Sequence, residues 1–433
     1  MIRPWLSRST HITRSRLTAT AALAAIGALG LAACAAAPAS SSGSSSGAGI
    51  TVDFWGSAPQ ATTMKEIIAA WNKAHPSSPV TGTWVQNNYE EKVLSSIAGG
   101  APPQVMEISN TSLAGFASSL LPLSASTAPY ANKSVINGGM YNGKLYALPF
   151  QSDPKVMAVN ETLFKQAGVP LPSTTVPMTV SQFATLATKL SHGSGKQRVY
   201  GSADLWFDGF LAAEGGGVYN TAGTTCTLDS QQAVSALNLI INSQTVSDFA
   251  PSYEAALGQD MTQWFDAGRL AMVPDTGPWD ISNYTASNVP WEFIPMPGKG
   301  EPLEIDNFGV LNSAAGAQRT TAESFVNWMS TSPAAQDLLV QQGNTLGIPI
   351  ISSAITKAYS DLPAADNMGA FAVDAGIEPI WPSVGKDPQI ETALSNDLSS
   401  DTAAGTGHGS AGPALASAQK SCAQTLSSSS LSS

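Results

Sequence analysis

The chain has 433 residues, of which 43% are hydrophobic and only 12% charged, and 20 Lys and Arg stand against 31 Asp and Glu, giving −11. The first 33 residues contain four arginines and no acid, so the remainder has 16 basic and 31 acidic residues, a net charge of −15. This acidity argues against a nucleic-acid-binding protein and against electrostatic docking to an anionic bilayer, because both need basic surfaces. The length and composition exclude disorder for most of the chain and favour two lobes or domains.

The N-terminus has the features of an export signal. Four arginines are followed by residues 17–33, an uncharged run rich in Ala and Gly that is short for a permanent membrane span. Residues 31–34 (LAAC) resemble the bacterial lipobox, in which the cysteine becomes the lipid-modified N-terminus. The alternative is an ordinary cleavage site with a chance cysteine. We expect a signal peptide over 1–33, lipidation of Cys34 and a flexible Ser/Gly linker over 34–49.

The other two cysteines are one possible pair. Cys226 and Cys422 would lie in an oxidising compartment if the protein is exported. A bridge between them would close a loop of roughly 200 residues, worth about 4–5 kcal/mol in the chain-entropy model. Two unpaired buried thiols are the alternative. No CxxC motif and no Cys/His cluster points to a metal, so no cofactor is expected.

From residue 50 onwards, short apolar runs alternate with helical patterns. Residues 50–55 alternate as a strand, and apolar side chains at positions 64, 67, 68 and 71 recur with helical spacing. A strand is predicted around 80–86, a helix over 90–98 that ends at two glycines, and a further strand over 104–108. This βαβ alternation predicts a mostly parallel sheet with helices on its faces.

The alternation continues through the rest of the chain. We predict a strand at 155–160, a helix at 181–190, a helix capped by Asp229 and Ser230, and a buried strand at 269–273. Ser332 and Pro333 have the chemistry of a helix start, and Gly343 that of its end. The Ser-rich residues 423–433 are expected to be a disordered tail.

The catalytic inventory is thin. The chain has no HExxH, GxSxG or P-loop motif, and its four histidines lie in the leader, at a helix end and in Gly/Ser loops. One GxGxxG match, at 407–412, follows no strand and lacks a βαβ context, so it is a coincidence. A pair of carboxylates for glycoside hydrolysis is possible, because their spacing is spatial, but nothing in the sequence selects one. We expect a protein that is not an enzyme.

What recurs instead is an aromatic or amide side chain beside Gly, Pro, Asp or Asn in a predicted loop. Such loops occur at 55–57, 109–111, 150–153, 206–208, 277–280 and 379–382. Ligand sites in open α/β sheets collect beyond the carboxyl ends of strands. An aromatic face supports the C–H face of a pyranose, and Asp, Asn and Gln bond its hydroxyls. Core packing is the alternative for any single Trp. Together these loops favour polyol recognition.

Several segments, in order, resemble the carbohydrate-binding family of ABC-importer solute-binding proteins, which includes maltose-binding protein. They are ITVDFWGS at 50–57, WNKAHP at 71–76, GGAPPQV at 99–105, YNGKLYALPF at 141–150, NETLFKQAG at 160–168, FDAGRLAM at 265–272 with GPW at 277–279, and SFVNWM at 324–329. The match covers residues 50 to about 420. Gln104 departs from the usual Asp, and Val180 from a packing Trp.

The resemblance implies an α/β fold with two lobes, each a mostly parallel sheet flanked by helices, joined by hinge strands. Lobe one would comprise 50–155 and 305–340, and lobe two 156–304 and 341–422. It also implies an interlobe sugar site, with stacking by the Trp residues and hydrogen bonds from the polar ones. The implied ligand-binding residues are Trp55, Asn110, Gln151, Asp153, Trp206, Asp208, Trp279, Asp280, Asn307 and Trp381, with Asp306 as a possible hinge residue.

We therefore expect a monomer, lipid-anchored on the extracellular face of the cell membrane, that captures a mono- or oligosaccharide and delivers it to separate permease and ATPase subunits. Two alternatives stay open. The same scaffold could bind another solute, such as a polyamine or a phosphodiester, since an acidic site favours cations. A surface enzyme acting on glycans is the other alternative, which turnover would reveal.

Overall fold

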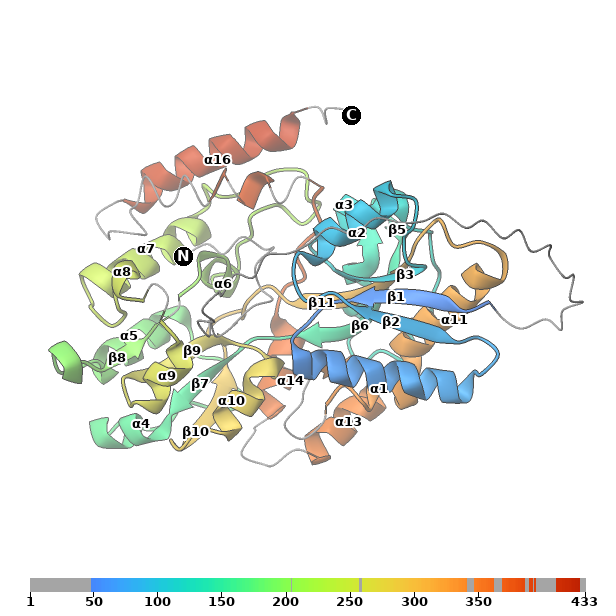
Figure 1. Cartoon of the computed structure of the whole chain (residues 1–433). Coiled ribbons are helices and arrows are strands. Elements are labelled where there is room, and N and C mark those ends of the chain that lie inside the picture. Colours follow the sequence, from blue (N-terminus) through green and yellow to red (C-terminus); the bar gives the residue numbers. More distant parts are fainter. Residues whose placement is uncertain are drawn as a thin grey trace, which may run out of the picture.

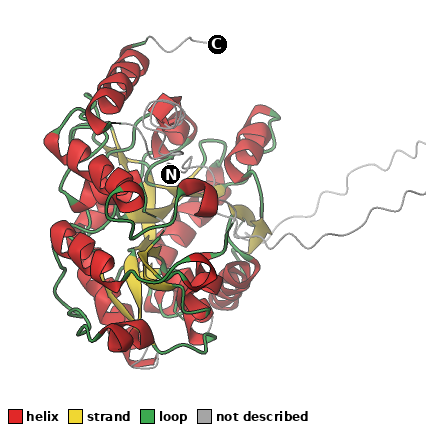
Figure 2. Ribbon diagram, turned by 90° about the vertical axis from the view of Figure 1, so that its left-hand side faces the viewer, coloured by secondary structure: helices red, strands yellow, loops and turns green. Residues whose placement is uncertain are grey.

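The computed structural model describes residues 48–203, 205–256, 259–340, 346–361, 368–385, 389–391, 393–394 and 410–428. They form two α/β lobes, each built on its own sheet (Figure 1). The strands lie inside and the helices surround them (Figure 2). The expected signal peptide, Cys34 and linker residues 34–47 lie outside the described residues.

The first lobe has a six-stranded sheet in the order β12-β6-β11-β3-β1-β2. Its strands are β1 (Ile50–Phe54), β2 (Val80–Trp84), β3 (Val105–Ser109), β6 (Ala147–Asp153), β11 (Glu304–Val310) and β12 (Ile348–Pro349). Its helices are α1 (Ala58–Ala74), α2 (Tyr89–Ala98), α3 (Leu113–Phe116), α11 (Gly316–Thr331), α12 (Pro333–Gln336) and α13 (Ser352–Asp361). A small hairpin joins β4 (Met140–Tyr141) to β5 (Lys144–Leu145).

The second lobe has a four-stranded sheet in the order β10-β7-β9-β8. Its strands are β7 (Val156–Asn160), β8 (Tyr200–Ser202), β9 (Leu270–Thr276) and β10 (Trp291–Pro295). Its helices are α4 (Glu161–Ala167), α5 (Val180–Leu190), α6 (Phe207–Ala213), α7 (Gln231–Thr245), α8 (Tyr253–Ala256), α9 (Met261–Asp266), α10 (Ile281–Thr285), α14 (Met368–Ile377) and α16 (Ala411–Ser427).

Local sequence accounts for the longer helices. In α1, Ser57 and Gln60 form a reciprocal capping box, and Met64, Ile67, Ile68 and Trp71 are buried on the face that the periodicity predicts. Helix α5 begins with the same device, here between Thr179 and Gln182. Ser230 caps α7, as predicted.

The prediction of mostly parallel sheets is wrong in detail. In the first sheet β1 pairs in parallel with β2 and β3, but β11 is antiparallel to β3 and β6, and β12 to β6. In the second sheet only β8 and β9 pair in parallel. Strands such as β11 return from the other lobe rather than through a covering helix, so they run against their neighbours. The fold class is α/β with mixed sheets.

Two predicted boundaries also need correction. Strand β12 pairs with β6, and α13 follows it, so the first part of the segment 341–422 belongs to the first lobe. The tail predicted over 423–433 is helical as far as Ser427, because α16 buries Ala414, Leu415, Ala418 and Cys422 at helical spacing. The remaining residues, 429–433, lie outside the described part of the chain.

The predicted helix from Pro333 is cut short. Helix α12 ends at Gln336, whose Nε2 donates to the carbonyls of Phe150 and Met329 and whose Oε1 accepts from the Ile350 amide. The buried amide of Gln336 thus bonds to the backbone at Phe150, Met329 and Ile350, and the chain leaves the helical path after it. The predicted end at Gly343 lies outside the described residues.

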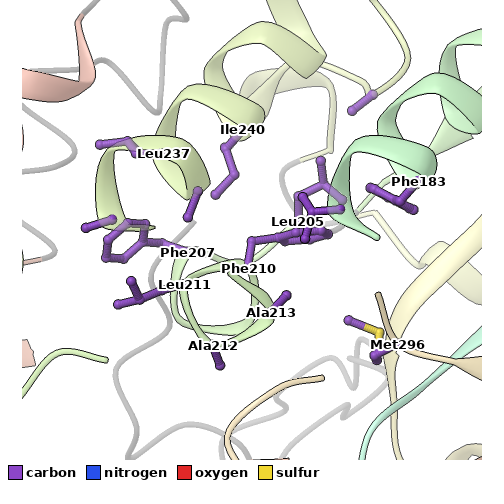
Figure 3. Packing of buried hydrophobic residues seen from close by; sticks show 14 of the residues in the cluster. Phe183, Leu205, Phe207, Phe210, Leu211, Ala212, Ala213, Leu237, Ile240 and Met296 are labelled. Atoms are coloured by element: carbon purple, nitrogen blue, oxygen red, sulfur yellow. The ribbon is translucent and has the colours of Figure 1, made fainter. Parts of the chain in front are cut away.

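A disulfide joins Cys226 to Cys422, with a Cα–Cα distance of 6.2 Å across 196 residues of sequence. It ties α16 to the loop that precedes α7. Gln419 reinforces the joint, since its Nε2 donates to the Cys226 carbonyl and its Oε1 accepts from the Leu228 amide. The hydrophobic core beside it is shown in Figure 3, where Leu237 and Ile240 of α7 approach Phe207 and Phe210 of α6.

Candidate functional site

The chain passes between the two sheets at two places that the structure describes in full. Strand β6 ends at Asp153 in the first sheet and β7 begins at Val156 in the second, so residues 153–156 form the first crossing segment. Residues 295–304, between β10 and β11, form the second crossing segment. Ionisable side chains gather around both. The candidate site is built from them.

Three buried carboxyl groups meet at the end of β6. The Nε2 of Gln151 lies 3.0 Å from Asp306 Oδ2 and 3.4 Å from each carboxyl oxygen of Asp153. Glu107, on β3, accepts a 3.0 Å bond from the Trp55 amide through Oε2. We call Glu107, Gln151, Asp153 and Asp306 the junction cluster. Each of these side chains is at most 4% exposed.

Burial makes the charged form of these acids costly. It raises the pKa of Glu107 to about 8, against the weaker opposing effect of the Trp55 hydrogen bond. It raises the pKa of Asp153 to about 7, although the charge of Lys155 opposes the shift. The pKa of Asp306 is raised well above its ordinary value, first by burial and then by the charge of Asp153. Burial therefore favours the protonated form of these acids near neutral pH, least strongly for Asp153.

A buried lysine connects the cluster to an aromatic ring. Lys155 is 1% exposed, and its Nζ donates a 3.0 Å bond to the Asp153 carbonyl. The same atom lies 4.2 Å from the ring centroid of Trp279, a cation–π contact. Trp279 is half-buried and lies in the turn after β9. Gly277 allows this packing, because a Cβ there would lie 2.5 Å from the ring.

The last turn of α14 and the first residue after it fasten both crossing segments. Glu378 Oε1 accepts from the Lys155 amide at 3.1 Å and from the Glu301 amide at 3.3 Å. Asp374 Oδ2 accepts from the Met296 amide at 2.9 Å. Burial raises the pKa of Glu378 to about 8 and that of Asp374 well above its ordinary value. One carboxyl group thus bridges the two segments that link the lobes.

Replacing Glu378 with Ala should lower the free energy of unfolding by about 2–4 kcal/mol, because two buried amides lose their acceptor. Glu378→Gln keeps an oxygen acceptor and should cost less than half as much. Urea denaturation of both variants near pH 6 measures the difference. Equal losses in the two variants would contradict the bridging role.

Four of the predicted residues gather at this junction. Gln151 and Asp153 belong to the junction cluster, Trp279 is joined to it through Lys155, and Trp55 through its bond to Glu107. The Trp55 ring is half-buried and packs edge-on against Tyr89, at 4.9 Å between centroids.

Three other predicted residues have partners in the protein itself. Asn110 Oδ1 accepts from the Ile305 amide at 2.9 Å. Asn307 is fully buried, and its Nδ2 donates to the carbonyls of Ile305, Ile108 and Gly138. Asp280 Oδ2 accepts from the Gly277 amide at 3.1 Å and closes the turn that carries Trp279. These side chains hold β3, β11 and the turn in place.

The last three predicted residues lie elsewhere in the second lobe. Trp206 is 5% exposed at the start of α6, and Asp208 is half-buried in its first turn. Trp381 follows α14, is 9% exposed and belongs to the hydrophobic core, with Gly217 close to its indole nitrogen.

Sequence reasoning missed Glu107, Lys155 and Glu378. Glu107 is the one acid within the five buried residues of β3, and Lys155 is a cation in a run of buried residues. An ionisable residue inside an otherwise apolar strand is the signal that could have found Glu107. Glu378 gives no such signal, because its partners are more than 70 residues away.

Within the described residues, no group of three or more His, Cys, Asp or Glu side chains is arranged to hold a metal ion. Across the same part of the chain, no helix combines the length and apolarity needed to cross a bilayer.

Comparison with known sequences gives a family match. The model of a family described as bacterial extracellular solute-binding protein matches residues 66–367, more than half of the chain. An uncharacterized lipoprotein in the oleD 5′ region of Streptomyces antibioticus is 26% identical over 256 residues, which cover 54% of this chain and 55% of that protein. The match thus spans about half the length of that relative.

Solved structures give the same fold over most of both chains. An ABC substrate-binding protein from Listeria monocytogenes in complex with cycloalternan has a TM-score of 0.74 at 21% identity, covering 87% of this chain and 98% of that one. The sugar-binding protein MalE from Xanthomonas citri has a TM-score of 0.73 at 18% identity, covering 88% and 97%. UgpB from Mycobacterium tuberculosis, in complex with glycerophosphocholine, has a TM-score of 0.70 at 19% identity, covering 86% of this chain and 98% of that one.

At these identities the likeness is one of fold, with two lobes as in the solute-binding structures. The family match rests on the sequence itself and includes all of the second lobe up to β10, together with both crossing segments. The chain belongs to the family of bacterial extracellular solute-binding proteins.

Proposed function

We propose that this protein captures a carbohydrate for an ABC importer, holds it between the lobes without chemical turnover, and delivers it to separate permease and ATPase subunits. The observation that carries the proposal is the half-buried Trp279, which Lys155 links to Asp153 and so to the buried polar side chains where the chain crosses between lobes. An apolar ring edged by hydrogen-bonding groups suits a pyranose. Family membership and the sugar complexes of fold relatives support it.

The ligand contacts follow from the same geometry. Trp279 would stack against the sugar, and Gln151 and Asp153 would bond its hydroxyls, with Trp55 at the side of the first lobe. Trp206, Asp208 and Trp381 are proposed as contacts from the second lobe. Asn110, Asp280 and Asn307 would act by holding the backbone, since their side chains already bond to it. Hinge closure at the two crossing segments would enclose the ligand.

Export and anchoring are part of the proposal. The arginine-rich leader and residues 31–34 support lipidation of Cys34, which would hold a monomer on the extracellular face of the membrane. A lipoprotein relative supports this location. Cys34→Ser should release the protein from the membrane fraction into the medium or leave its leader uncleaved.

A ligand panel tests the function. We expect the melting temperature to rise with one class of sugar and with no amino acid or glycerophosphodiester. A ligand at a hundred times its dissociation constant adds about 2.7 kcal/mol to the free energy of unfolding. The bound sugar, recovered and weighed after incubation, should be unchanged. Stabilisation only by non-sugars would overturn the carbohydrate proposal, and cleavage of the sugar would overturn binding without turnover.

Trp279→Ala should weaken sugar binding by about 1–3 kcal/mol while leaving the melting temperature of the free protein nearly unchanged, because the half-buried ring contributes more to ligand contact than to the core. Trp279→Phe keeps an aromatic face and should lose less. Calorimetric titration of both variants measures the effect. Unaltered affinity in Trp279→Ala, or loss of its fold, would place the ring in the core.

A further inference from the structure

Residues 379–385, which follow α14, contact both lobes, and we call them the strap. They have no regular secondary structure. At its start the strap is fixed to the second crossing segment, because the Pro379 carbonyl accepts from the Leu303 amide at 2.9 Å. Further along, Trp381 and Val384 are buried in the hydrophobic core of the second lobe. The strap is therefore anchored in the second lobe at several points.

Between these two buried residues, Ser383 bonds to the first lobe. Its Oγ accepts from the Ala114 amide at 2.9 Å and donates to the Thr111 carbonyl at 3.0 Å. Both partners lie where the chain passes from β3 into α3, and Leu113 between them is buried in the core of the first lobe. One hydroxyl group thus joins two segments that are anchored in different lobes.

The bond to Ala114 takes the place of a local helix cap. The first amides of a helix have no partner within the helix, and a serine just before it usually accepts from one of them. Ser112 stands at that position of α3, but its side chain makes no cap bond, and its hydroxyl bonds instead to the Glu90 carboxyl group. The start of α3 therefore depends on a hydroxyl group from the second lobe.

The disulfide lies behind the strap. Residues 217–227 fold back on themselves through backbone hydrogen bonds, and we call them the disulfide hairpin. This hairpin packs closely on the strap, since a Cβ on Gly223 would lie 3.1 Å from Val384 Cγ2. Near the end of the hairpin, Cys226 is bonded to Cys422 of α16. The bridge thus fixes the surface on which the strap rests.

We propose that the strap holds the two lobes together through Ser383, and that the Cys226–Cys422 disulfide keeps the strap in the position from which it does so. A bond that exists in only one arrangement of the lobes shifts their equilibrium towards that arrangement. The partners of Ser383 are backbone atoms of the protein itself. The strap therefore acts without a ligand, and the proposal does not depend on which solute is bound.

The first test measures hydrogen exchange in the full chain without ligand. Ser383→Ala should raise the exchange rate of the amides over residues 111–116 at least about threefold, because Ala114 loses its acceptor. Ser383→Thr keeps a hydroxyl group and should restore protection. Ser332→Ala is the matched control, since it removes the cap of α12, which like α3 has four residues, but within the first lobe. It should leave residues 111–116 unaltered.

Fluorescence energy transfer between the lobes shows whether this bond holds them together. Dyes are attached through non-canonical amino acids at two exposed residues, Glu91 of α2 and Asn238 of α7, which lie in different lobes (Figure 1). Transfer should fall in Ser383→Ala and return in Ser383→Thr, because the open arrangement gains population in the first variant only. Unaltered transfer would reduce Ser383 to a local cap and overturn the proposal, as would unaltered exchange over residues 111–116.

Two further variants test the role of the disulfide. Cys226→Ala/Cys422→Ala removes the bridge, and Val384→Ala removes a contact between the strap and the disulfide hairpin while the bridge stays intact. Each should speed exchange over residues 111–116 and lower the transfer, by less than Ser383→Ala does. Wild-type values in Val384→Ala or in the folded double variant would overturn the support of the strap by the disulfide. If melting curves show that the double variant fails to fold, Val384→Ala decides alone.

Discussion

Loss of the Cys226–Cys422 disulfide should lower the free energy of unfolding by about 4–5 kcal/mol, the largest effect expected of any single change in this chain. The bridge spans 196 residues of sequence, so its removal frees a long loop in the unfolded state. In the folded state both cysteines are buried, α16 packs a small apolar face against α7, and Gln419 bonds it to the loop before α7. Reduction should also release α16 first.

The measurement is chemical denaturation with and without reductant. The double variant Cys226→Ala/Cys422→Ala should unfold as the reduced protein does and be insensitive to reductant, which separates the bridge from other effects of the reagent. A Gln419→Ala variant tests the hydrogen bonds alone and should cost about 1–2 kcal/mol. A reduced protein as stable as the oxidised one would contradict the prediction.

Stability without ligand should fall by a few kcal/mol as the pH rises from about 5 to about 8.5. The pKa values of Glu107 and Glu378 are raised by burial to about 8, and that of Asp153 to about 7. Acids whose pKa is higher in the folded state contribute stability that is complete below their unfolded pKa. That contribution is lost as the pH rises through the folded pKa, when the buried groups must ionise.

Urea unfolding across this pH range measures the slope. Glu107→Gln and Glu378→Gln should each flatten the profile, because the amide does not ionise and keeps an acceptor oxygen. Glu323→Gln, on α11, where the side chain is 39% exposed, serves as the control and should leave the slope unaltered. Stability that stays level or increases towards pH 8.5 would contradict the burial of protonated acids.

The local elements were predictable because their causes are local. Each capping box, at Ser57 and at Thr179, joins residues three positions apart. The helical spacing of apolar residues in α1 and α5 also involves only neighbouring turns of one helix. The alternation of strands and helices was enough for the α/β class. The direction of β11 was not predictable, since its pairing with β3 and β6 joins residues about 150 to 200 positions apart.

The candidate site divides in the same way. Residues that belong to a recognisable motif, such as Trp279 in its Gly-Pro-Trp turn and Asp153 at the end of β6, could be named from the sequence. The partners that each of these side chains contacts could not be predicted. Asn307 looked like a ligand contact, but three backbone carbonyls occupy its amide because β3, β11 and the segment at Gly138 converge on it. Lys155 was placed only at the start of a predicted strand, and its burial comes from the fold.

The sequence by itself determined the family, the single possible cysteine pair and most of the helices and strands, and it predicted an export signal, because each depends on order, composition or short-range spacing. Only the tertiary structure decided which polar side chains bond to the backbone and which meet in the junction cluster. It also brought Glu107, Asp153 and Asp306 together and placed Glu378 across both crossing segments. Burial and charge arise from long-range packing, and these set the chemistry of the site.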